Sequence, residues 1–321
     1  MRKKVASIAN RIDERISLLH VSILKERPAL LIFLFHSLYE EKQTLASATV
    51  DAQQNITVAV FSEFIEYFLS NGYIFISPDN IEGVLDKNKK YALITFDDGY
   101  FNNQLALPIL RKYKVPAVFY VSANHVAAGK SFWWDVVYRQ RQKLNKPWQQ
   151  QGEYGMLKQR KNHEIEKYLI EQFGQQCLHP VSDLDRPFTP AELQEFARDP
   201  YVVIGNHTHN HAILTNYTVA EVEAELLESQ QYLTKLLGTA PTSIAYPNGN
   251  YSKEVVAIAK RLGFQTGVTV REGKNRLSVC TDALGLMELN RFLLWGDTDI
   301  KRQLKLFRSD LHIKRAIRNQ R

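Results

Sequence analysis

The chain has few cysteines. Only Cys177 and Cys280 occur among its 321 residues, and nothing around either one suggests a metal site or a reactive thiol. Two widely separated cysteines leave a single disulfide open, but they favour two inert thiols in a reducing compartment. The cysteine content therefore favours a cytoplasmic protein.

The chain also lacks a long hydrophobic run. Residues 1–4 carry the positive charge of a signal-peptide start, but polar residues between Asn10 and Arg15 interrupt the apolar segment that should follow. The apolar run at 29–35 is far shorter than the roughly 20 residues that a membrane-spanning helix needs. We interpret this run as a buried strand and expect a soluble protein.

The composition is that of a folded, mildly basic protein. Hydrophobic residues make up 45% and charged residues 23%, which argues against broad disorder, and the net charge is +7. Residues 301–321 hold eight Lys or Arg and one acid, Asp310, so much of the excess lies in this basic C-terminal tail.

Two interpretations of the tail stay open. Leu304, Phe307 and Leu311 share a helical face surrounded by cations, which suits a packed or solvated final helix. The same pattern suits docking on anionic lipid, which would make the protein membrane-peripheral. No recognised motif accompanies the charge, so we expect no nucleic-acid partner.

Strand-like and helix-like segments alternate along most of the chain. Apolar spacing predicts an N-terminal helical extension over 1–28, closed by Pro28. Buried strands are predicted at 30–35, 91–96, 117–121, 202–204, 243–246 and 266–270, and helices at 62–71, 105–113, 219–237 and 253–262. This alternation indicates an α/β fold in which crossover helices join parallel strands, as a doubly wound sheet or a barrel.

One segment interrupts this rhythm. Residues 125–200 contain Trp133 and Trp134, then a polar stretch, then three prolines, and we interpret them as a mostly helical insertion that covers the site. No boundary divides the pattern, so we expect a single domain over 1–321 with a barrel core at about 29–300.

The first chemical motif is Thr95-Phe96-Asp97-Asp98-Gly99. It ends a predicted buried strand, where α/β folds build their sites, and Gly99 permits a sharp exit. Adjacent residues on an extended chain point in opposite directions, so Asp97 and Asp98 need not share a role. A bound divalent metal would also remove the repulsion between two neighbouring carboxylates.

The second motif contains three histidines in five residues, His207-Thr208-His209-Asn210-His211, directly after another predicted strand. His207 and His211 would face one way if the turn after the strand is helical. Imidazole is a common ligand of zinc-like ions, and two His with one Asp leave coordination positions open, as in a catalytic site.

Three further segments carry candidate site residues. In Tyr246-Pro247-Asn248-Gly249 the turn can hold the Asn248 backbone N–H toward a site, where it would stabilise an oxyanion. Arg291, among apolar residues, needs a carboxylate partner, for which Asp97 is the candidate. His36 ends the first strand and is expected on the same barrel face, as a general acid or a hydrogen-bond partner.

Taken together, these motifs resemble those of the NodB-type polysaccharide deacetylases, carbohydrate esterase family four. The resemblance covers roughly residues 30–292 and implies a distorted (β/α)7 barrel, here with an N-terminal helix, a helical insertion and a basic C-terminal helix. It implies that Asp97 is the catalytic base and that Asp98, His207 and His211 bind one divalent metal, usually Zn²⁺, with Co²⁺, Ni²⁺ or Mn²⁺ as alternatives.

The resemblance also has departures. The third motif is similar to a Y-P-x-G variant, which places Tyr246 and Pro247 at the substrate and gives the oxyanion donor to Asn248. Arg291 looks like the arginine that orients the base in relatives. The family's late histidine acid has no clear counterpart, so we assign that role to His36.

The expected function is therefore removal of N-acetyl groups from an N-acetylated sugar in a polysaccharide or its lipid-linked precursor. Two alternatives stay open: a metal-dependent esterase on O-acetylated glycan, and a glycan-binding protein whose catalytic site has decayed. Phosphodiester hydrolysis is disfavoured because that chemistry commonly uses two metals, and only one metal site is evident.

Overall fold

Eight strands form one parallel sheet in the computed structural model, which describes residues 2–24, 26–41, 50–51, 53–81, 85–146, 150–278, 282 and 284–311. The strands follow the order β7-β6-β5-β4-β3-β1-β8, and β2 pairs with β3 outside this path. They are β1 (Leu30–Phe35), β2 (Tyr73–Phe75), β3 (Lys90–Phe96), β4 (Ala117–Val121), β5 (Val202–Asn206), β6 (Ser243–Ala245), β7 (Thr266–Val268) and β8 (Phe292–Leu293).

The central strand β3 has three partners. All of β1 pairs with one edge of β3, opposite residues 91–96. β2 and β4 therefore share the other edge of β3. β2 takes the first half, opposite 90–92, and β4 takes the second half, opposite 94–96. This split distorts the ring of strands.

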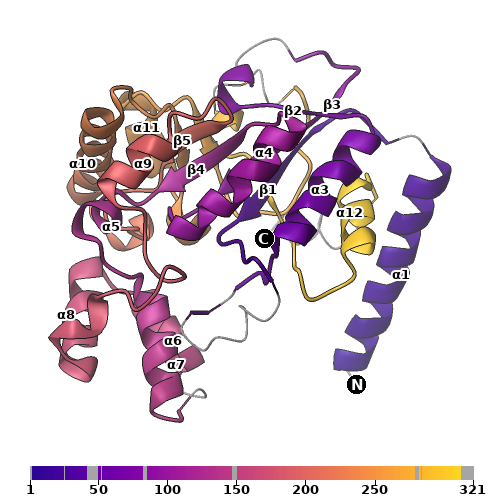
Figure 1. Cartoon of the computed structure of the whole chain (residues 1–321). Coiled ribbons are helices and arrows are strands. Elements are labelled where there is room, and N and C mark those ends of the chain that lie inside the picture. Colours follow the sequence, from indigo (N-terminus) through magenta and orange to yellow (C-terminus); the bar gives the residue numbers. More distant parts are fainter. Residues whose placement is uncertain are drawn as a thin grey trace.

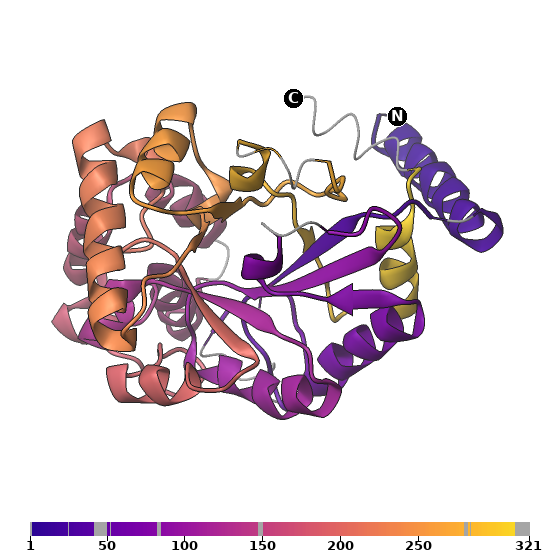
Figure 2. The same ribbon diagram turned by 90° about the horizontal axis from the view of Figure 1, so that it is seen from above.

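The last strand segment closes the ring. Leu289 bridges to Val268 of β7, and Phe292 pairs with Phe33 of β1. Seen from above, the curved sheet is surrounded by helices (Figure 2). The predicted α/β fold, a distorted (β/α)7 barrel, is therefore confirmed.

Helices cover the outside of the sheet and extend from it (Figure 1). They are α1 (Arg2–Ile23), α3 (Val58–Ser70), α4 (Leu107–Tyr113), α5 (Ala123–Ala128), α6 (Trp133–Lys143), α7 (Gln150–Leu157), α8 (Asn162–Phe173), α9 (Pro190–Phe196), α10 (Val219–Leu237), α11 (Lys253–Arg261) and α12 (Ile300–Arg308). Short 3₁₀ turns lie at Pro78–Asn80, Phe101–Ala106, Gln175–Leu178, Leu214–Asn216, Pro247–Gly249 and Gly285–Met287.

An aromatic cluster joins β1 to the helices that cover it. Phe33 packs on Phe64 of α3, on Phe292 of β8 and on Phe307 of α12, with ring centroids 4.7, 5.9 and 5.7 Å away. Each such ring removes a large apolar area from water. Because Leu304 and Phe307 are both buried, α12 is a packed helix, with Lys301 and Arg302 exposed and Arg308 paired with the buried Glu26. The tail beyond residue 311 lies outside the described residues.

The insertion between β4 and β5 has its own core. Helices α6, α7 and α8 pack around a buried cluster that includes Trp133, Trp134, Leu157 and Leu169. Cys177 lies in the same cluster as a free, buried thiol, whereas Cys280 falls outside the described residues. Within the described ranges, no helix has the length and apolarity to cross a membrane.

Candidate metal centre and active site

The two neighbouring carboxylates diverge at the end of β3. The Asp97 backbone N–H donates to the Phe35 carbonyl at 2.9 Å and so continues the strand pairing. Asp98 then has φ 78° and Gly99 has φ 88°, which turns the chain sharply away. Left-handed φ is costly for a residue other than glycine, and such strain is typical of functional sites. The turn sends Asp97 and Asp98 to different partners.

Asp97 forms a bidentate ion pair with Arg291. The guanidinium Nη1 and Nη2 lie 2.7 and 2.8 Å from the two carboxylate oxygens, 194 positions away in sequence. The Arg291 Nε donates to the Thr269 carbonyl at 2.8 Å, which fixes the plane of the guanidinium. Burial raises the pKa of Asp97, but the charge and hydrogen bonds of Arg291, together with the charges of His207 and His36, hold that pKa below its usual value.

Removal of Arg291 is expected to destabilise the fold strongly. Arg291→Gln leaves the Asp97 carboxylate buried without a counter-charge, which should lower the free energy of unfolding by about 3–5 kcal/mol. The matched control is Arg261→Gln, because the Arg261–Glu223 pair is exposed, and it should cost about 0–1 kcal/mol. Urea unfolding monitored by circular dichroism measures both, and equal losses would contradict the prediction.

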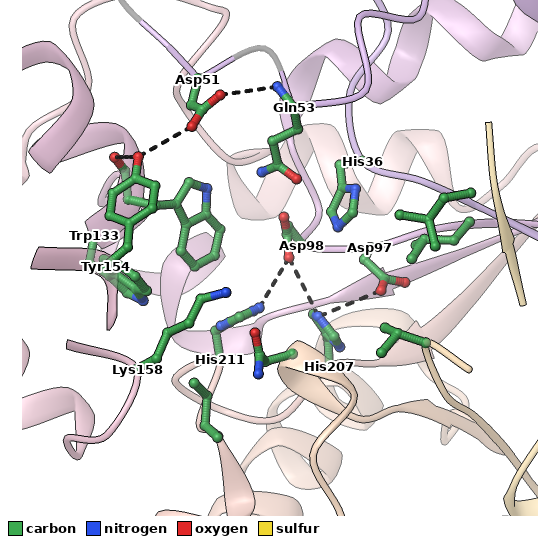
Figure 3. A pocket seen from close by; sticks show the side chains of 16 residues that line it. His36, Asp51, Gln53, Asp97, Asp98, Trp133, Tyr154, Lys158, His207 and His211 are labelled. Carbon is green, nitrogen blue, oxygen red and sulfur yellow. Dashed lines mark hydrogen bonds and ion pairs between the residues drawn. The ribbon is translucent and has the colours of Figure 1, made fainter. Parts of the chain in front are cut away.

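Asp98 lies against two imidazoles. Its Oδ1 is 3.4 Å from His207 Nε2 and 3.3 Å from His211 Nε2 (Figure 3). One potential ligand atom from each of the three residues lies within 4.8 Å of the others. The expected convergence of these side chains is therefore present.

A helical turn, which would have aligned the two histidines, is absent. The segment 207–213 contains no helix; instead Thr208 and His211 take φ of 64° and 54°. Hydrogen bonds hold this bend, since the Thr208 N–H donates to the Asn206 side chain and the Thr208 hydroxyl accepts from the Ala212 N–H, both at 2.8 Å. Backbone strain, rather than helical spacing, brings the imidazoles together.

The potential ligand atoms of His207 and Asp98 are in a state that suits binding of a cation. His207 Nδ1 bonds to the Ala245 carbonyl at 2.8 Å, so this nitrogen carries the proton and leaves Nε2 as a ligand. Asp98 Oδ2 is buried without a hydrogen-bond partner. Burial raises the pKa of Asp98, but its interactions with the imidazoles of His207, His211 and His36 together outweigh burial and lower that pKa. A carboxylate, two imidazoles and an unsatisfied oxygen fit a divalent metal.

The middle histidine of the motif points elsewhere. His209 Nε2 lies 3.8 Å from Glu228 of α10. His209 does not belong to the potential ligand group that the described residues form.

The third segment contributes one predicted site residue to the pocket. Asn248, with φ 57°, lines it. Tyr246 and Pro247 are buried and are not among the described residues that line the pocket. The Tyr246 hydroxyl donates to the Met287 carbonyl at 3.1 Å, so its position indicates support of the turn rather than contact with a ligand.

His36 faces the pocket from the end of β1. Its Nδ1 lies 2.9 Å from Gln54 Oε1, while Gln54 Nε2 donates to the Leu34 and Leu294 carbonyls at 2.8 and 3.0 Å. Because the Gln54 amide donates elsewhere, its oxygen must accept here, and His36 Nδ1 carries the hydrogen. His36 Nε2 is thus left for proton exchange.

The motifs border a cavity of about 350 Å³. Sequence reasoning assigned no site role to several of its lining residues, namely Asp51, Gln53, Trp133, Trp134, Tyr154 and Lys158. Most of these come from the insertion, and Trp133, Tyr154 and Lys158 lie on the side of the pocket away from Asp97 (Figure 3). The adjacent tryptophans in a polar stretch were the available signal.

Trp134 supports the metal centre from the insertion. Its ring lies 4.7 Å from the His211 ring, and its Nε1 donates to the Tyr100 hydroxyl at 2.8 Å. That hydroxyl donates in turn to the buried Asp135 carboxyl at 2.6 Å. The insertion therefore positions one of the two imidazoles, as well as covering the site.

Comparisons with known proteins agree with this geometry. The family model described as "Polysaccharide deacetylase" matches residues 85–267, which include Asp97, Asp98 and both imidazoles. A Bacillus subtilis protein named "Putative polysaccharide deacetylase YxkH" is 25% identical over 218 residues. The match covers 66% of this chain and 58% of that protein.

Solved structures share the fold. The Streptococcus pyogenes deacetylase PplD, in complex with acetate, is 21% identical with a TM-score of 0.59, over 88% of this chain and 99% of that one. A polysaccharide deacetylase from Bacillus cereus is 18% identical with a TM-score of 0.60, over 88% of this chain and 69% of that one.

Proposed function

Because this chain belongs to the polysaccharide deacetylase family, we propose that it is a metal-dependent hydrolase that removes N-acetyl groups from a sugar in a polysaccharide or its lipid-linked precursor. One observation carries the proposal: the three potential ligands converge within 4.8 Å in a pocket that Asp97 also lines. Two imidazoles and one carboxylate leave coordination positions open, as catalysis requires.

Asp98, His207 and His211 would hold the ion. Nitrogen and oxygen donors of this kind suit Zn²⁺, and also Co²⁺, Ni²⁺ or Mn²⁺. The ion would supply Lewis-acid polarisation of the acetyl carbonyl and a lowered pKa for water.

The side chains around the ligands divide the proton transfers. Asp97 takes a proton from the attacking water, while Arg291 keeps the carboxylate ionised and oriented. The Asn248 backbone N–H donates to the oxyanion that develops on the carbonyl oxygen. His36, when it carries protons on both ring nitrogens, gives its Nε2 proton to the departing nitrogen, the C–N bond breaks, and the products are acetate and a free amine.

The pocket walls suit a sugar ring. Trp133 and Tyr154 offer aromatic faces, and Asp51 and Gln53 offer polar groups that can bond to hydroxyls. This mixture supports an acetylated glycan as the substrate.

An acetate-release assay tests the proposal. Incubation with N-acetylated glycans and lipid-linked precursors should release acetate, chelation should stop the release, and Zn²⁺ should restore it. Matched O-acetylated glycans serve as the comparison. Release from the O-acetylated set alone would favour an esterase, and glycan binding without any release would favour a decayed binding protein.

A further inference from the structure

Helix α1 is oriented with its polar side inward. Among its described side chains, Asp13, Ser17 and His20 are buried against the protein. Ser17 bonds to the Leu311 carbonyl, and His20 Nε2 lies 3.7 Å from the Asp310 carboxylate. An ordinary surface helix buries its apolar face instead.

The apolar side of α1 faces outward. Ile16, Leu19 and Ile23 are 39%, 59% and 68% exposed, and their spacing places them along one stripe, while Leu24, directly after the helix, is 57% exposed. We call these four residues the α1 stripe. Leu311, which is 45% exposed, follows α12 beside Ser17. Contiguous exposed apolar residues mark a surface that binds something.

The excess positive charge is concentrated in the two terminal segments of the sequence. Residues 1–27 carry seven Lys or Arg against three acids, and residues 301–321 carry eight against one. The remaining 273 residues hold 26 basic and 30 acidic side chains, so the net charge of +7 comes entirely from the two terminal segments.

The described parts of these two segments lie side by side. Helices α1 and α12 are in contact at one edge of the molecule, away from the insertion (Figures 1 and 2). Arg302 of α12 pairs with Glu14 of α1, and Lys305 bonds to Ser22 at 2.5 Å. Two exposed cations lie on this edge: Arg15 on α1, next to the stripe, and Lys301 on α12.

We propose that the α1 stripe and the surrounding cations dock this protein on an anionic membrane surface. The apolar side chains enter the boundary between headgroups and acyl chains, while the cations contact lipid phosphates. A second copy of the chain is the weaker alternative, because the same cations would repel each other across a two-fold interface. The proposal does not depend on the hydrolase assignment.

Vesicle flotation tests the apolar contribution. The wild-type protein should float with phosphatidylcholine vesicles that contain phosphatidylglycerol and not with phosphatidylcholine alone. A variant with Leu19→Ser, Ile23→Ser and Leu24→Ser should bind at least about tenfold more weakly. The matched control carries Leu144→Ser, Val181→Ser and Val219→Ser, which are 52%, 54% and 58% exposed elsewhere, and it should bind as the wild type does.

The charge contribution needs a separate variant. Arg15→Gln with Lys301→Gln should weaken binding roughly fivefold per cation, and salt at about 1 M, where the Debye length is ~3 Å, should weaken wild-type binding too. All variants should keep the wild-type thermal midpoint, because the changed side chains are exposed.

Three results would overturn the proposal. The first is equal binding to neutral and anionic vesicles, and the second is wild-type binding by the stripe variant. The third is a wild-type protein that does not bind vesicles but forms a dimer, which dissociates when the stripe is changed.

Discussion

Asp97→Asn is expected to lower the rate of acetate release about 10²–10⁴-fold while metal content stays at the wild-type level. The amide is close in size to the carboxylate but cannot take a proton from water. Asp97 is bonded to Arg291 and lies 4.0 Å from His207, whereas the three potential metal ligands form a separate group. Steady-state kinetics with metal analysis of the same preparation measures both quantities.

A folding defect must be separated from loss of the base, because Asn leaves Arg291 without its counter-charge. The Arg291→Gln variant disturbs the same ion pair but keeps the Asp97 carboxylate, so it should retain more activity than Asp97→Asn at a temperature where both are folded. Normal turnover by Asp97→Asn would remove Asp97 from the base role.

His207→Ala is expected to abolish both metal binding and acetate release. Loss of a mere outer hydrogen-bond partner lowers metal affinity or activity about 10–100-fold, and loss of a ligand should exceed that. The hole left by the imidazole also exposes the Ala245 carbonyl that His207 Nδ1 now satisfies. Isothermal titration of the metal-depleted protein with Zn²⁺ gives the affinity.

The matched control is His209→Ala, two residues along the same loop. Its imidazole faces Glu228, so metal affinity and turnover should stay at the wild-type level. If His209→Ala lost the metal and His207→Ala kept it, the assignment of Asp98, His207 and His211 as the ligands would be wrong.

Most of the barrel could be predicted because its strands are long apolar runs. The bounds of β1 and β4 match the predicted 30–35 and 117–121, and α10 matches 219–237. β2 and β8, which have three and two residues, were not predicted. The strand conformation of β8 depends on its pairing with β1, which is distant in sequence.

Some residues of the candidate site could also be predicted from the sequence, and others could not. Asp97, Asp98 and the imidazoles follow strand ends, and parallel strands bring their carboxyl ends to one edge, so their meeting could be predicted. The wall from the insertion could not, because Trp134 and Lys158 reach the pocket through loop and helix packing. The role of Tyr246 at the substrate stays a prediction, although its hydroxyl bonds to the Met287 carbonyl.

The two partners of the Asp97–Arg291 pair are made at different times during translation. Asp97 leaves the ribosome with β3, but its counter-charge arrives only with residues 289–293, the segment that also closes the ring of strands. Until that segment docks, the nascent barrel has an open edge and a carboxylate that cannot be buried at low cost. The Asp97–Arg291 pair therefore forms late in translation, so we expect a chain cut short before β8 to be inactive even though it contains Asp98, His207 and His211.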